Sequence, residues 1–449
     1  MNSNLKFIFG SFILATLCVL NACGPAGYRP DFLIPQVAIT NLKVLPPVVA
    51  YSSDGKQLLL GINTSYVEGY SPKGSFYLLD ANGQTEKKLF LDVELAEISQ
   101  LAWLPNKHEF NFVVQAQYAS VSVPSVLYQA NPDQTEPVAI FKDLYKMILG
   151  YAWSPDGQRL AIISQSKRSS PGEDVKQPPT LYLEFFKTGT LEAEKQLEFM
   201  GEFNQMDWIS NKELALSLKS SDKAFQSTES TTSPNFEIYR LHSDTLETGN
   251  LTQNAANETD FVVVPERQEL VFFSDRTPLP ELYTLSLKDQ QTKKLYGAIN
   301  QSNFPWPCLS GQGRLKINNL QGQGLLVSNY HKERPQNASL CGVAFLFESY
   351  YQQSYNPPFT LIGTDISPTS MAIVPGKTQL ILLRLLTTGQ YLESVTSGSR
   401  GYFDTQITQK FIGPNQLLLS KLDLANTHES PIRTIDFPYG QARFSPILF

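Results

Sequence analysis

The chain has 449 residues and a formal net charge of −6, and its Lys and Arg residues form no basic patch. A mildly acidic chain without such a patch excludes nucleic acid as a partner. Its length exceeds the common single domain of about 50–200 residues, so we expect either several domains or one domain built from repeats.

The first residues have the pattern of a secretory signal. Residues 1–6 are polar with one positive charge, and residues 7–20 are mostly apolar. Such a segment is too short and wrongly flanked for a membrane-spanning helix. No later apolar run reaches the length of about 18 residues that spanning requires, so we expect the chain beyond its N-terminal anchor to be soluble.

The end of this segment reads L-N-A-C-G at residues 20–24. It resembles the bacterial lipobox, in which an aliphatic residue, two mostly small residues and a cysteine mark the cleavage site. Asn21 departs from the usual small apolar residue. The resemblance implies cleavage before Cys23 and acylation of its thiol. The alternative is an ordinary secretory signal in which Cys23 has no role.

The lipoprotein resemblance divides the chain into three parts. Residues 1–22 are expected to be the cleaved signal peptide, residues 23–35 a lipid-anchored linker, and residues 36–449 the propeller domain described below. The protein would then be exported and held in the cell envelope by acyl chains such as palmitate on Cys23. The resemblance leaves open whether the inner or the outer membrane holds it.

Two further cysteines remain, Cys308 and Cys341. An even pair in an exported protein favours a disulfide bond, and free buried thiols are the alternative. Two cysteines without a histidine in ligand spacing are too few for a zinc site. We therefore expect no metal and no cofactor.

A pattern recurs along the chain at steps of roughly 50 residues. Its clearest copy is Y-A-W-S-P-D-G-Q-R-L-A-I-I at residues 151–163, where a strand leads into a Pro-Asp-Gly turn and a second strand follows. The other copies, some degenerate, begin at residues 51, 103, 208, 263, 321, 373 and 412. Several short strands per repeat at this period are typical of a β-propeller blade.

The repeat copies predict an all-β protein, a β-propeller of about eight four-stranded blades, with six or seven as alternatives. The last repeat is short, and residues 37–45 have the pattern of an additional strand. We expect this N-terminal strand to complete the last blade and close the ring, because an open ring leaves strand edges free to pair with other chains.

Two repeats resemble those of TolB-like and WD40-like propellers. They are the copy at residues 151–163 and the segment F-S-D-R…L-Y at residues 273–283. The resemblance covers about residues 45–440 and implies the propeller fold. The additional N-terminal domain of TolB is expected to be absent, because too few residues lie between Cys23 and the first repeat. The resemblance therefore carries over no partner.

Several repeat residues have side chains that also occur in functional sites. Trp103, Trp153 and Trp208 have the same place in three repeats. We expect them to pack between blades rather than to form a ligand platform. Asp54 and Asp156 precede glycine in tight turns, where aspartate provides local hydrogen bonds and no catalysis is implied.

The sequence contains none of the spacings that mark nucleophile elbows, zinc proteases, phosphate loops or dinucleotide-binding turns. We therefore expect a protein-binding or scaffold module, and not an enzyme. One alternative is a hydrolase or lyase that acts on envelope glycans or peptides in the propeller channel. Another is a sensory or substrate-binding subunit of a membrane complex.

Long connections are expected on one face of the propeller. If the Asp-Gly-type turns join first and second strands, the connections from second to third strands lie on the opposite face. Because loops on a rigid scaffold often carry binding residues, we expect a protein or envelope-polymer partner on this long-loop face, with tolerated variation as the alternative. The long connections span residues 63–75, 117–125, 164–180, 217–234 and 331–339. The candidate contact residues are Tyr66, Tyr70, Tyr118, Lys167, Arg168 and Arg334.

Overall fold

In the computed structural model of the protein, nearly every described element is a β-strand, which confirms the all-β class. No described helix is long and apolar enough to cross a membrane. The structure describes residues 36–41, 47–63, 74–84, 86–89, 97–115, 124–134, 136–166, 179–190, 193–220, 225, 235–277, 281–296, 313–319, 324–331, 340–347, 359–360, 371–387, 390–396, 406–412, 415–424 and 428–437.

The chain forms two compact units. The larger unit comprises Leu42–Thr388 and Pro414–Phe449, and the smaller one comprises Met1–Asn41 and Gly389–Gly413. The larger unit contains all the sheets that the repeats encode, and the smaller one contains a single three-stranded sheet.

Five sheets of the larger unit have four antiparallel strands each. The first contains β2 (Val48–Tyr51), β3 (Gln57–Asn63), β4 (Gly74–Asp80) and β5 (Glu86–Leu89). The second contains β6 (Glu97–Trp103), β7 (Phe110–Gln115), β8 (Ser125–Ala130) and β9 (Val138–Asp143). Another contains β17 (Glu258–Val264), β18 (Glu269–Ser274), β19 (Glu281–Ser286) and β20 (Thr292–Tyr296). The next contains β21 (Gly313–Asn319), β22 (Gly324–His331), β23 (Leu340–Phe347) and β24 (Phe359–Thr360). The last contains β25 (Met371–Ile373), β26 (Gln379–Thr387), β29 (Asn415–Asp423) and β30 (His428–Phe437).

One further sheet of this unit has seven strands, because β13 belongs to two four-stranded arrays. Its first half pairs with β12 and its second half with β14. Counted in this way, the described strands form seven four-stranded arrays, within the predicted range, and we call them blades 1 to 7 in chain order. The strands of the large sheet are β10 (Lys146–Trp153), β11 (Arg159–Ser166), β12 (Thr180–Lys187), β13 (Lys195–Trp208), β14 (Glu213–Ser220), β15 (Glu237–His242) and β16 (Thr248–Asn250).

Neighbouring blades bury apolar side chains against each other. Phe76 of blade 1 and Trp103 of blade 2 belong to one buried cluster. Leu60 of blade 1 also shares a cluster with Ile381 of blade 7. The first and last blades are therefore neighbours, and the burial of apolar sheet faces is what holds consecutive blades together.

The Asp-Gly turns have the local chemistry predicted from the sequence. In blade 3 the hydroxyl of Ser154 donates to Asp156 Oδ1 (2.6 Å), and the N–H of Gln158 donates to the same oxygen (3.0 Å). The Ser154 hydroxyl lowers the pKa of Asp156. Gly157 has a φ of +66°, which glycine adopts without strain. Asp54 accepts the equivalent bonds in blade 1.

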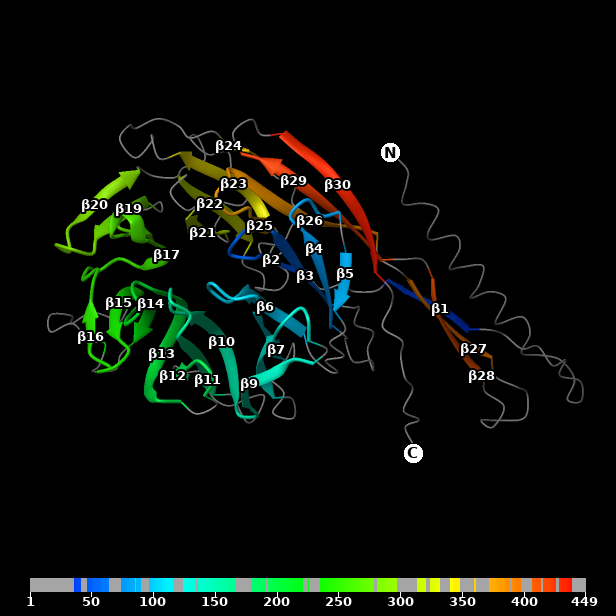
Figure 1. Ribbon diagram of the computed structural model, residues 1–449, viewed down its shortest axis with the longest axis horizontal. Helices are drawn as coiled ribbons and strands as arrows, with labels where there is room; N and C mark the ends of the chain where they lie inside the picture. Colours follow the sequence, from blue (N-terminus) through cyan, green and yellow to red (C-terminus); the bar gives the residue numbers. More distant parts are fainter. Residues whose placement is uncertain are drawn as a thin grey trace, which may run out of the picture. The chain divides into compact units, whose positions relative to one another are not determined.

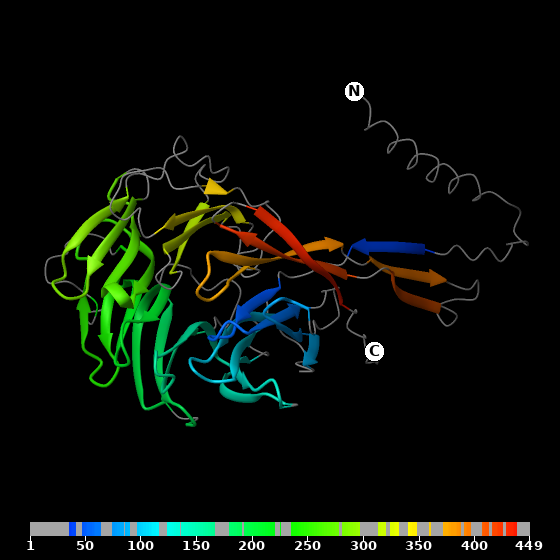
Figure 2. The same ribbon diagram turned by 45° about the horizontal axis from the view of Figure 1, so that its top comes forward.

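The N-terminal strand β1 (Gln36–Asn41) does not complete blade 7. It pairs with β27 (Gln390–Thr396), which pairs on its other side with β28 (Gln406–Ile412). Figures 1 and 2 show the blue β1 beside the orange pair. The prediction that an N-terminal strand closes the ring is therefore wrong. The main-chain groups of β1 find their partners in β27, and all four strands of blade 7 come from residues 371–437.

The repeat copy that begins at residue 412 is not the turn of an eighth blade. β28 ends at Ile412, and Asn415 begins β29, which returns to blade 7 beside β26. The β27–β28 hairpin is an insertion between the second and third strands of that blade. Its short alternating strands have the same sequence pattern as blade strands, which explains the additional copy.

Candidate functional site: a cavity between the innermost strands

The innermost strands of blades 2 to 5 each contain a β-bulge at the same place. The additional residue comes four positions before the last residue of the strand in every case. A bulge locally bends its strand and redirects a side chain. The four bulge residues are Ser99 in β6, Leu149 in β10, Asn204 in β13 and Asp260 in β17.

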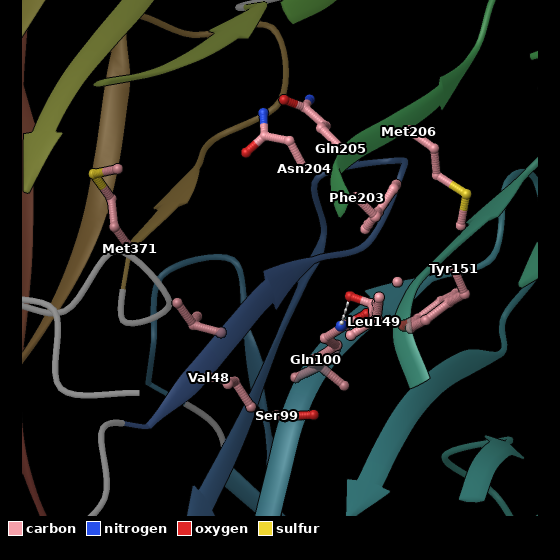
Figure 3. Close-up of a pocket in the computed structure, with 13 residues that line it drawn as sticks. Val48, Ser99, Gln100, Leu149, Tyr151, Phe203, Asn204, Gln205, Met206 and Met371 are labelled. Carbon is pink, nitrogen blue, oxygen red and sulfur yellow. Dashed lines mark hydrogen bonds between the residues drawn. The ribbon is translucent and has the colours of Figure 1, made fainter. Parts of the chain in front are cut away.

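A cavity of about 450 Å³ lies between the innermost strands of five blades (Figure 3). Its volume falls in the range of small-molecule sites, about 300–1,000 Å³. Three of the four bulge residues line it, and Asp260 does not. The lining residues are Val48, Val49, Ser99, Gln100, Leu101, Leu149, Gly150, Tyr151, Phe203, Asn204, Gln205, Met206 and Met371.

The residue after the bulge connects neighbouring blades. Gln100 Nε2 of blade 2 donates to the carbonyl of Leu149 in blade 3 (3.0 Å), as Figure 3 shows. Gln205 Nε2 of blade 4 donates to the carbonyl of Phe261 in blade 5 (2.7 Å), and its Oε1 accepts from the N–H of Phe261 (3.2 Å). The Gln100 bond fixes the spacing of two strands that line the cavity, and the Gln205 bonds join β13 to β17, which does not line it.

Two polar atoms at the cavity have no hydrogen-bond partner in the described part of the chain. They are the hydroxyl Oγ of Ser99 and the amide Nδ2 of Asn204, and both are shielded from solvent. A buried polar atom without a partner costs about 1–3 kcal/mol. Because neither atom is accessible to solvent, neither is open to the cavity, and Ser164 Oγ is in the same state away from it.

The described lining contains no Asp, Glu, His, Lys, Arg or Cys side chain. Its titratable group is the phenol of Tyr151, whose hydroxyl donates to the carbonyl of Asn111 (3.1 Å). Burial raises the pKa of Tyr151, so the phenol is neutral at physiological pH. A charged ligand would lose hydration here without gaining a counter-charge. The cavity therefore fits an uncharged ligand.

The described residues offer no metal site. No three or more of their His, Cys, Asp and Glu side chains come close enough to one another to hold a metal ion.

The tryptophans at the ends of the inner strands pack between blades, as predicted. Trp103 and Trp208 are buried. Their Nε1 atoms donate to main-chain carbonyls of the preceding blade, at 3.1 and 3.0 Å. Trp153 is half-buried and donates to Asn111 Oδ1 (2.7 Å). It also lines a second cavity of about 470 Å³ between blades 2 and 3.

Most site residues predicted from the sequence lie outside the described residues. Cys341 is part of β23, but its expected partner is not described, so the disulfide and the lipid anchor remain predictions. The predicted residues outside the described part are Cys23, Cys308, Tyr66, Tyr70, Tyr118, Lys167, Arg168 and Arg334.

Sequence reasoning missed Ser99 and Asn204. Both begin similar segments, S-Q-L-A-W at residues 99–103 and N-Q-M-D-W at residues 204–208. In both segments a polar pair comes at the same distance before a tryptophan. This shared spacing is the sequence signal that could have singled out the two residues. The bulge that places these side chains at the cavity has no comparable signal in one sequence.

No family model matches the chain, and no curated protein sequence matches it. Similar solved structures exist. An oligogalacturonate lyase in complex with manganese has 12% identity and a TM-score of 0.50, and the match covers 80% of this chain and 95% of that one. The β-propeller domain of the Trilobed protease from Pyrococcus furiosus, with an open velcro topology, has 10% identity and a TM-score of 0.50, over 91% and 100%. An acylaminoacyl peptidase in complex with Z-Gly-Gly-Phe-chloromethyl ketone has 10% identity and a TM-score of 0.50, over 84% and 57%.

At these identities the comparisons show the fold alone. The β-propeller fold that the repeats predicted is confirmed. The prediction that the chain is not an enzyme is wrong. It relied on missing motifs, whereas a lyase and a peptidase are among the structures with the same fold, and one fold hosts many activities. The chain has the fold of a β-propeller.

Proposed function

We propose that the protein is a lipid-anchored β-propeller of the cell envelope that binds an uncharged ligand between its innermost strands. The observation that carries the proposal is the cavity of about 450 Å³ between the innermost strands of five blades, whose described lining has no charged side chain. A concave site of this volume, with polar groups that orient the ligand, is the usual form of a small-molecule site.

A second candidate is an enzyme that acts on an envelope glycan or peptide at the same cavity. Its support is the presence of a lyase and a peptidase among the similar structures. General acid–base catalysis needs a group whose pKa lies near the working pH. The described lining supplies no such group. Catalysis would therefore need a residue from outside this lining, whereas binding would not.

A partner surface on the long-loop face is a further part of the proposal. The link from β9 to β10 lies on this face, because β10 ends at the Asp-Gly turn on the other. Tyr145 is 71% exposed and Leu144 is 44% exposed. Asp143 Oδ1 accepts from the N–H of Tyr145 (2.7 Å), which holds the link in one conformation. An exposed aromatic side chain on such a link favours contact with a partner.

Photo-crosslinking in cells tests the cavity as the binding site. A photoreactive residue in place of Leu149 preserves the main-chain carbonyl that Gln100 uses. It should form a covalent adduct that mass spectrometry detects. The matched control is the same residue in place of Met200, which is 37% exposed and lines neither cavity. Equal labelling at both positions, or none at position 149, would contradict the proposal.

Cell fractionation tests the anchor. We expect Cys23→Ser to yield a protein that stays precursor-sized or is released in soluble form, because the acyl chains are lost. Each buried CH₂ of such chains contributes about 0.8 kcal/mol to membrane binding. If the Ser variant still sediments with membranes after a salt wash, the anchor lies elsewhere.

A further inference from the structure

We propose that the second cavity, between blades 2 and 3, binds a small aromatic carboxylate. This site is separate from the cavity between the innermost strands and does not depend on the function proposed for it. Its volume of about 470 Å³ also falls in the range of small-molecule sites. The cavity lies on the face of the Asp-Gly turns, because the lining residue Thr188 donates its hydroxyl to the carbonyl of Gly157 in the turn of blade 3 (2.7 Å).

Trp153 is held differently from the tryptophans at the same position of two other blades. Trp103 and Trp208 are buried and donate to main-chain carbonyls of the preceding blade's innermost strand. Trp153 is half-buried and donates instead to the side-chain oxygen of Asn111 on the second strand, β7 (2.7 Å). Asn111 is fully buried, and its amide nitrogen donates to the carbonyl of Tyr128 (3.0 Å). Both ends of this amide are therefore used, and they hold the indole at the edge of the cavity.

One wall of the cavity is an apolar row across three strands of blade 3. Trp153 in β10 pairs with Leu160 in β11, and Leu160 pairs with Phe186 in β12. All three line the cavity, as does Val138 of blade 2, which is 57% exposed. The cavity is therefore open to solvent on that side, and a ligand can reach the half-buried indole. Because the indole N–H is already bonded, the ring offers a ligand its apolar surface, on which another aromatic ring packs well.

Three charged residues line the cavity, and two of them already have a partner. Glu109 Oε2 accepts from Gln129 Nε2 (2.8 Å), and Lys187 forms an ion pair with Glu194. Lys107 is half-buried, and it has no carboxylate partner among the residues that the structure describes. Its ammonium is the lining charge that remains for a ligand, so the matching ligand group is an anion such as a carboxylate.

The lining favours this class over two others. It contains two lysines and one glutamate, so its described charges sum to one positive charge. An organic cation could stack on the indole, but it would be repelled by this excess charge. A phosphate or sulfate ion could pair with Lys107, but it has no apolar part for the row that Trp153 begins. An aromatic carboxylate uses both the apolar row and the unpaired ammonium.

Isothermal titration calorimetry with the full mature protein in detergent tests the ligand class. The probes are phenylacetate, its amide phenylacetamide, the cation phenethylammonium and the non-aromatic acid cyclohexylacetate. We expect phenylacetate to bind roughly fivefold tighter than each of the others, because each lacks either the charge contact or the aromatic contact. Equal binding of the amide or the cation would overturn the carboxylate, and equal binding of cyclohexylacetate would overturn the aromatic ring. No binding of phenylacetate would overturn the site.

Tryptophan fluorescence tests the location of the bound probe. Phenylacetate should change the fluorescence of the protein, because it packs on Trp153. Trp153→Phe should abolish this change while retaining an aromatic ring for the packing between blades. A change that persists in the variant would come from one of the other three of the four tryptophans, and would overturn the location.

Lys107→Met tests the charge contact. We expect it to weaken phenylacetate binding roughly fivefold and to leave phenylacetamide binding unaffected. The matched control is Lys56→Met, because Lys56 lies in the corresponding turn of blade 1 and lines neither cavity. Equal weakening by both variants, or weaker binding of the amide to Lys107→Met, would overturn the role of Lys107. The crosslink at position 149 tests the first cavity alone, so the two proposals can fail separately.

Discussion

The inner strands differ between their last residues, which enter the Asp-Gly turns and form what we call the turn level, and the bulges four residues earlier, which form the bulge level. At the level where the strands enter the Asp-Gly turns, Trp103, Trp153 and Trp208 each donate their indole N–H to an acceptor in the preceding blade. Four residues earlier, at the bulges, Ser99 and Asn204 have polar atoms without a partner. Both levels link neighbouring blades, through indole N–H groups at the turns and through the amides of Gln100 and Gln205 at the bulges, but among the described residues only the bulge level also leaves polar atoms unpartnered.

We expect the greatest loss of stability from truncating a tryptophan that packs between blades at the turn level. Trp208 is 3% exposed, and we expect Trp208→Ala to lower the free energy of unfolding by about 3–5 kcal/mol, because it leaves a cavity and an unpaired carbonyl. Guanidinium unfolding monitored by circular dichroism measures the change. Trp153→Ala is the control and should cost less, because Trp153 is half-buried. A loss below about 1 kcal/mol in Trp208→Ala would show that this level does not hold the blades.

A second effect is the pH dependence of stability that we expect from Asp207, which lies in β13 between the bulge and Trp208. Burial raises the pKa of Asp207 to about 6, and the N–H of Trp208 partly opposes the shift by donating to its carboxylate (2.8 Å). The folded-state pKa lies above the unfolded value of about 3.9. Stability from this group is therefore present below pH 4 and is lost as the pH rises to 6, by on the order of 2–3 kcal/mol.

Asp207→Asn should remove that pH dependence and retain an acceptor for Trp208. The measurement is the free energy of unfolding from pH 3.5 to 7 in both proteins. We expect the variant to gain stability relative to the unmodified protein across this range. A constant difference between the two curves would mean that Asp207 titrates normally.

Much of the fold could be predicted from the sequence because its turns are local. The segment S-P-D-G at residues 154–157 specifies a turn through bonds within a few residues, and a period near 50 then indicates blades. The pairing of β1 with β27 joins residues that lie far apart in the chain. A repeat pattern cannot encode such a partner, and for this reason both the predicted ring closure and the eighth copy were wrong.

The candidate site was less predictable than the fold. Trp103 and Trp208 were assigned to packing because a large aromatic side chain at a repeated position fills the space between sheets. Ser99 and Asn204 have ordinary polar side chains, and only their bulges and the neighbouring blades shield them from solvent. Burial of this kind arises from tertiary structure, so a single sequence does not reveal it.

A third, smaller effect tests the glutamines that space the bulge level. Gln205 makes two hydrogen bonds to the main chain of Phe261, whereas Gln100 makes one to Leu149. We expect Gln205→Leu to cost about 1–3 kcal/mol, because the N–H and carbonyl of Phe261 lose their partner. Gln100→Leu should cost about half as much. If both variants are as stable as the unmodified protein in urea unfolding, these two side chains do not stabilise the contacts between blades.

The smallest effect concerns Asn204, whose pairing at the bulge level can be measured without a ligand. If Asn204 Nδ2 has no partner in the free protein, replacing the amide with a similar apolar side chain removes a penalty. We predict that Asn204→Leu raises the free energy of unfolding by about 1 kcal/mol in urea unfolding without ligand. A decrease of that size instead would show that the amide is already paired in the fold, and would contradict the claim that this polar atom at the bulge level has no partner.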